Sequence, residues 1–132
     1  MAIKSSASSR GIALYLQSLV PTLATLLRGV TAYAADGAIT IKSGVASLTK
    51  SSAGAYTLAA PSAAQEGTVI HIVAGTAAAH VVTIASTSLL DGTSTAKGKA
   101  TTAAYIGSGI SVVAVNQKWL LLSNVAATLA AS

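Results

Sequence analysis

Cysteine and phenylalanine are absent from this chain of 132 residues, and only one tryptophan is present. Without cysteine the chain forms no disulfide bond and offers no thiolate to a metal ion. Aromatic residues make up 4% of the sequence, so Trp119 carries the largest apolar side chain available to a core. We expect this ring to be buried with the leucines at 120–122 and to anchor the fold.

Charged residues are also scarce, at 8% against about 25% in an ordinary soluble domain. The net charge of +5 comes from basic residues that stand singly or in pairs, without a run. Binding of nucleic acid needs clustered Lys and Arg with aromatic platforms, so we expect no nucleic acid as a partner. Alanine supplies 29 of the 132 residues. This composition favours a surface covered by other copies or partners, and the alternative is a bland exterior of small polar side chains.

From residue 36 onward, apolar residues recur with a period of two, which is typical of β-strands. Turn signals such as Asp36-Gly37 and Asp91-Gly92 separate these runs. No helical period lies between them, which disfavours a parallel sheet built from βαβ units. The sequence therefore predicts an all-β fold, an antiparallel β-sandwich or small barrel of about eight short strands. The predicted strands are 38–42, 45–50, 55–59, 68–73, 80–84, 99–106, 110–115 and 119–123.

The clearest strand signal is the stretch 110–123, ISVVAVNQKWLLLS, which predicts two strands joined by a tight turn at 116–118. The run 68–73 is strongly β-branched and apolar, so we expect it to be central and buried. The stretch 86–99 is rich in Ser, Thr, Gly and Lys, and it is predicted to be a long loop.

The first 35 residues differ from this pattern and predict an N-terminal arm. Residues 1–10 are polar and Ser-rich, and they indicate an extended lead-in. Apolar residues then recur at helical spacing, although Pro21 interrupts the pattern. We expect a broken amphipathic helix between about 9 and 28, and the alternative is an extended arm draped over a neighbouring molecule. The predicted division is thus an arm at 1–35, a β domain at 36–124 and a C-terminal tail at 125–132.

A targeting segment is an alternative interpretation of the same arm, which has a basic start, an apolar middle and a small-x-small site at Ala32-Tyr33-Ala34. Only 17 uncharged residues separate Arg10 from Arg28, and Pro21 lies among them. A membrane span requires about 20 predominantly apolar residues. We therefore expect no membrane as a partner.

Residues suited to catalysis or metal binding are few. The acids Asp36, Glu66 and Asp91 all stand in predicted turns, where turn chemistry accounts for them. His71 and His80 fall on adjacent predicted strands and so are candidates for spatial neighbours, but metal sites add further carboxylate or cysteine ligands. The sequence contains neither a Gly-x-Ser-x-Gly elbow nor a phosphate-binding loop. We therefore expect no enzyme, no cofactor, no metal site and no small-molecule substrate.

Several strand and turn motifs between residues 38 and 124 resemble those of the capsid decoration, or cement, proteins of tailed bacteriophages. The motifs are ITIKSGV at 39–45, LTK at 48–50, YTLAAP at 56–61, EGT at 66–68, AAAHVVT at 77–83 and NQKW at 116–119. The family commonly has Asp-Gly in place of Glu66-Gly67 and Asn-Gly in place of Asn116-Gln117. A type I′ turn prefers glycine at its second central position, so the second departure predicts a longer loop at 116–118.

The resemblance implies an all-β protein that sits on the outside of a capsid lattice as a homo-oligomer, most often a trimer. It implies the major capsid protein as the partner and the capsid surface of the virion as the location. The arm lies outside the resemblance, and its role is predicted from its own residues. Its basic residues suit an acidic lattice surface, and its apolar stripe suits burial against neighbours. The predicted capsid-contacting residues are Lys4, Arg10, Ile12, Leu16, Leu19, Leu23 and Arg28.

Two other functions compete with a structural role on the capsid. One is an adhesion module of a phage fibre or tail that binds a host glycan, which exposed aromatic residues in a groove would favour. The four tyrosines are spread along the chain, which disfavours this alternative. The other is a secreted or membrane-tethered β protein.

Overall fold

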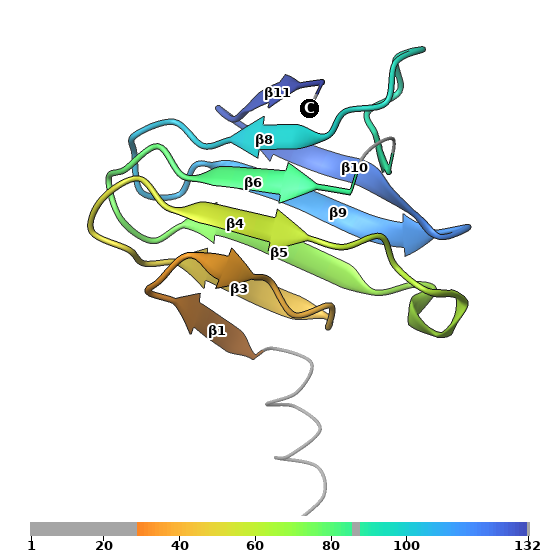
Figure 1. Ribbon diagram of the computed structural model, residues 1–132, viewed down its shortest axis with the longest axis horizontal. Helices are drawn as coiled ribbons and strands as arrows, with labels where there is room; N and C mark the ends of the chain where they lie inside the picture. Colours follow the sequence, from red (N-terminus) through yellow and green to blue (C-terminus); the bar gives the residue numbers. More distant parts are fainter. Residues whose placement is uncertain (1–28, 86–87, 132) are drawn as a thin grey trace, which may run out of the picture.

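The computed structural model describes residues 29–85 and 88–131, which form two β-sheets that face each other (Figure 1). The predicted all-β class is confirmed. Sheet A has the strand order β1-β3-β5-β9-β10-β7, and sheet B has the order β11-β8-β6-β4-β2. The strands of sheet A are β1 Val30–Tyr33, β3 Gly44–Leu48, β5 Val69–Ala74, β7 Leu89–Leu90, β9 Gly109–Val115 and β10 Lys118–Val125. Those of sheet B are β2 Gly37–Ala38, β4 Ala55–Leu58, β6 Val81–Ile84, β8 Lys99–Thr101 and β11 Thr128–Ala130.

The first six strands alternate between the sheets along the chain. As a result β1, β3 and β5 pair in parallel within sheet A, and β2, β4 and β6 pair in parallel within sheet B. The prediction of antiparallel pairing is therefore wrong for this half of the domain. Parallel neighbours need a long crossover connection. Here a strand of the opposite sheet forms part of each crossover, so no helix is required.

The second half of the domain pairs mostly in the antiparallel sense: β9 lies between β5 and β10, and β8 lies between β6 and β11. A two-residue turn joins β9 to β10, with φ angles of 50° at Asn116 and 57° at Gln117. The tight turn predicted at 116–118 is confirmed, and the alternative of a longer loop is wrong, because Gln117 adopts the left-handed conformation that usually requires glycine. Its backbone N–H donates to a carboxylate oxygen of Glu66 at 3.2 Å, which helps to hold the turn.

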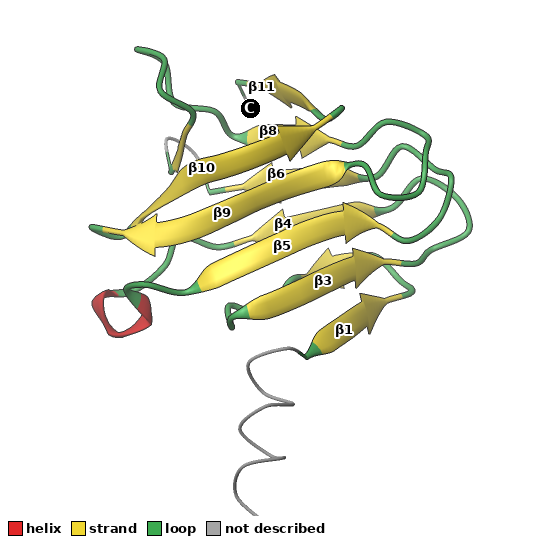
Figure 2. Ribbon diagram, turned by 180° about the vertical axis from the view of Figure 1, so that it is seen from behind, coloured by secondary structure: helices red, strands yellow, loops and turns green. Residues whose placement is uncertain are grey.

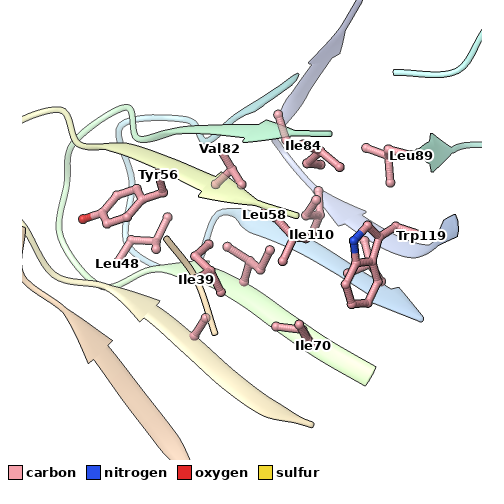
Figure 3. Close-up of a cluster of buried hydrophobic side chains, with 14 of the residues drawn as sticks. Ile39, Leu48, Tyr56, Leu58, Ile70, Val82, Ile84, Leu89, Ile110 and Trp119 are labelled. Carbon is pink, nitrogen blue, oxygen red and sulfur yellow. The ribbon is translucent and has the colours of Figure 1, made fainter. Parts of the chain in front are cut away.

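A single apolar core fills the space between the sheets (Figure 3). Trp119 on β10 is fully buried there, and its Nε1–H donates to the backbone oxygen of Ala59 at 2.9 Å. The partner of this N–H comes from the loop after β4, so the ring connects the two sheets. Leu48, Leu58 and Ile84 are also fully buried. The burial predicted for Trp119 is confirmed, but the burial predicted for the leucines at 120–122 is not: only Leu121 packs against the core, and Leu122 is 56% exposed.

Two strands lie outside the predicted β domain 36–124. β1 lies within the predicted arm, yet Val30 to Tyr33 pair in register with Val45 to Leu48 of β3. β11 lies within the predicted tail, yet it pairs with β8 at the edge of sheet B. Of the predicted strand 38–42 only Ala38 lies in a strand, and the predicted strand 99–106 ends at Thr101. The two residues of β7 fall in the predicted loop 86–99. Strands of two to four residues show too little alternation to be recognised.

Candidate interaction surface

The acidic side chains are engaged in local structure. An oxygen of Asp36 accepts from Lys50 Nζ at 2.9 Å and from the backbone N–H of Ala55 at 2.9 Å. These two donors, the lysine first, hold the pKa of Asp36 below its ordinary value. The hydroxyl and backbone N–H of Thr93 lower the pKa of Asp91 in the same way. Neither carboxylate faces a second one, so the paired-acid geometry of glycoside cleavage is not formed by them.

His80, at the start of β6, is fully buried and joins three segments of the domain. Its Nδ1 accepts from the backbone N–H of Gly54 at 3.1 Å, and its Nε2 lies 2.9 Å from Thr76 Oγ1. The Thr76 hydroxyl donates its proton to the oxygen of Lys50 at 2.6 Å, so Oγ1 must accept from Nε2–H. These partners fix a neutral ring. Burial, with the Lys50 charge adding to it, lowers the pKa of His80.

His71, on β5, lies far from this network because its side chain is exposed on the outside of sheet A. Its Nδ1 lies 2.7 Å from Ser111 Oγ on β9. A serine nucleophile needs a histidine that is itself oriented by a further group, in a site that excludes water. Over residues 29–85 and 88–131, no third group orients His71, and no cavity around the pair excludes water. Among the described residues, no group of three or more potential metal ligands occurs.

A hollow beside β1 is lined by Tyr33, Thr40, Val45 and Ile70. Its volume is ≈ 10 Å³, which is room for about one water molecule. This hollow cannot hold a small-molecule substrate. No helix in the described part of the chain is long and apolar enough to cross a membrane.

The outer surface of sheet A, the side that faces the viewer in Figure 2, carries a row of apolar side chains. Val69, Val113, Leu120 and Leu90 lie directly opposite one another across four neighbouring strands. All four alternate with buried residues, so they point outward from the core. We call the outward positions of sheet A the valine face: Val30, Ala32, Val45, Ser47, Val69, His71, Val73, Leu90, Ser111, Val113, Val115, Lys118 and Leu120.

The outer surface of sheet B has a different chemistry. Thr57 lies opposite Thr83, and Thr101 lies opposite Thr128. Thr57, Thr83 and Thr128 are exposed. We call this surface the threonine face: Ala38, Ala55, Thr57, Val81, Thr83, Lys99, Thr101, Thr128 and Ala130. Threonine suits a strand and presents a hydroxyl to water, so this face is stable when exposed. The valine face has no such hydroxyl array and loses more by exposure to water.

An exposed apolar pair lies at one end of the domain, in the loop between β8 and β9. Tyr105 and Ile106 are 74% and 72% exposed. The loop is nevertheless held in place, because Ser108 is buried and its hydroxyl connects the N–H of Ala103 to the oxygen of Val125. The backbone of this exposed tip is therefore held in a defined conformation by the Ser108 hydroxyl.

The seven predicted capsid-contacting residues, at 4–28, lie outside the described residues, and the structure does not place them. His71 and His80 lie in different sheets and do not form a common site. Sequence reasoning missed the valine face, although a signal was present. The runs that form β5 and β9 each carry two valines at outward positions, whereas β4, β6 and β8 each carry one outward threonine.

Comparison with known proteins returned no matching family model, no matching curated protein and no matching solved structure.

Proposed function

We propose that this protein is a structural virion protein that binds the outside of a tailed-phage capsid lattice and stabilises it. The observation that carries the proposal is the contrast between the two outer faces. The valine face favours burial against protein, and the threonine face favours contact with water. We propose that the two sheets act as a β-sandwich from which a partly helical arm reaches other molecules on the surface of a larger assembly. The motif resemblance to capsid decoration proteins supports the same assignment.

The size of the valine face indicates how binding would work. Six strands about 4.8 Å apart extend over roughly 24 Å, and strands of five to seven residues are about 17–23 Å long. The face therefore covers roughly 500 Å². A stable interface buries about 800 Å² on each partner, so a single contact of this size is weak. Copies that associate through this face and hold the lattice at several points gain affinity by multivalency.

The arm supplies the second part of the proposed mechanism. Lys4, Arg10 and Arg28 meet acidic surface on the major capsid protein, and the apolar stripe that includes Leu16 and Leu19 is buried against a neighbour. Electrostatic attraction orients the copies on the lattice, and apolar burial retains them. A trimer is the oligomer that the family resemblance favours.

Sedimentation of the protein with purified capsids tests the proposal. We expect the full chain to pellet with capsids and to saturate them at a fixed ratio. Val113→Lys, at the centre of the valine face, is expected to pellet much less, because it places a charge in an apolar contact. Thr83→Lys makes the matching change on the threonine face and should bind like the unchanged protein. If the chain fails to pellet, or if the two variants bind equally, the proposal is wrong.

A second candidate, an adhesion module for a host glycan, is favoured by the exposed ring of Tyr105. Aromatic side chains often pack against sugar rings, and this ring stands on a loop with a fixed backbone. Glycan-array binding that disappears in Tyr105→Ala would establish this function. An array without binding above background would exclude it.

A further inference from the structure

We propose that residues 12–27 of a neighbouring copy cover the valine face. This inference rests on the proposed association of copies and names the segment that mediates it. The capsid contacts of the arm then come from its ends, where the basic residues lie.

The valine face favours a cover because it is apolar at nine of its thirteen positions, the exceptions being Ser47, His71, Ser111 and Lys118, and its other side packs on the core. In β5, the outward Val69 and Val73 alternate with the buried Ile70 and Ile72. Parallel strands that are apolar on both faces usually lie between two layers of protein. The outward positions of sheet B hold four threonines, three alanines, Val81 and Lys99 instead. One side of sheet A packs on the core, and the other lacks a layer among the described residues.

The segment 12–27 matches this face in chemistry and length. It lies between Arg10 and Arg28, carries no charged residue and bears an apolar stripe at helical spacing. A helix of 16 residues is about 24 Å long. The valine face is roughly 24 Å wide across its strands. The stripe is therefore long enough to cross the face from one edge to the other.

The connection to β1 favours a neighbouring copy over the same chain. The backbone oxygen of Gly29 accepts from the N–H of Val45 at 3.0 Å, so Gly29 already follows the line of β1. Only Arg28 remains between this point and Leu27, the last residue of the stripe. The two residue steps from Gly29 to Leu27 span at most about 7 Å, whereas a layer packed on the sheet lies about 10 Å above it. A stripe that runs to Leu27 cannot rise onto its own sheet within that distance.

Cross-linking of the full chain tests the inference, and the absence of cysteine means that only introduced thiols react. Leu19→Cys, in a chain carrying a mass tag, is mixed with untagged Val113→Cys and treated with a short bismaleimide. We expect a product with the summed mass of the two chains. Untagged Thr83→Cys is the matched control, because it places a thiol on the threonine face. The yield with Val113→Cys should exceed the control several-fold.

Equal yields at the two faces, or no product, would overturn the inference. A second outcome would also overturn it. If a chain that carries both Leu19→Cys and Val113→Cys forms the cross-link only within single chains, the arm covers its own sheet. The experiment contains no capsids, so its failure is separate from that of the proposed function. Capsid binding without this cross-link removes the inference alone. The cross-link without capsid binding removes the proposed function alone.

Discussion

Replacement of His80 tests the account of how the loops are held together at one end of the domain. In His80→Ala, the buried N–H of Gly54 loses its acceptor at 3.1 Å, which costs about 1–3 kcal/mol. The ring also leaves a cavity beside Tyr56, whose ring centroid lies 5.8 Å away, and loss of such a fully buried side chain adds about 2–3 kcal/mol. Thr76 keeps its bond to the oxygen of Lys50. We expect the free energy of unfolding to fall by about 3–6 kcal/mol.

His80→Asn is the matched variant, because its Oδ1 occupies the position of Nδ1 and can accept from Gly54. It should recover about 1–3 kcal/mol of the loss in His80→Ala. Urea unfolding followed by circular dichroism at pH 7.5 measures both, provided that the slope of the transition stays constant. If the Asn and Ala variants are equally unstable, the bond to Gly54 contributes nothing and the reasoning is refuted. If both are as stable as the unchanged protein, the buried network has no stabilising role.

Three other predictions concern pH, the β9–β10 turn and the core. Because folding lowers the pKa of His80, the unfolded chain binds more protons than the folded one near that pKa. The free energy of unfolding should therefore be greatest above about pH 6.5 and should decline as the pH falls below it. In urea titrations at several pH values, His80→Asn should lose this decline and His71→Gln should keep it. Gln117→Gly keeps the backbone bond to Glu66 and removes the cost of a positive φ at a residue with a side chain. The free energy of unfolding should therefore rise by about 0.5–1 kcal/mol, and a fall would contradict the turn assignment. Trp119→Phe leaves the oxygen of Ala59 without its donor and shrinks the ring, so the thermal midpoint should fall by several degrees, and an unchanged midpoint would refute the anchoring role.

Much of the strand pattern could be predicted from residue types alone. Six of the predicted strands overlap four or more residues of observed ones, because β-branched residues alternate there with buried positions. The tight turn at Asn116-Gln117 was placed correctly. The bond from Gln117 to Glu66, which lies in a distant loop, helps to hold the turn without glycine and is not visible in the sequence.

The sense of strand pairing was not predictable by the same reasoning. Alternation specifies which side chains face the core and is the same for parallel and antiparallel neighbours. The loops 49–54 and 75–80 are too long for tight hairpins, and this was the available signal that the chain crosses to the other sheet at these points. The valine face also depends on pairing, since Val69, Val113, Leu120 and Leu90 come together only through the strand order of sheet A.

The central claim is that this domain lies in many copies on the outside of a capsid. An electron cryomicroscopy reconstruction of capsids with and without the bound protein tests it most directly. The account predicts added density at symmetry-related positions on the outer surface, into which the two-sheet domain fits with its threonine face toward solvent. Density inside the shell, density confined to the tail, or an unchanged outer surface would contradict it.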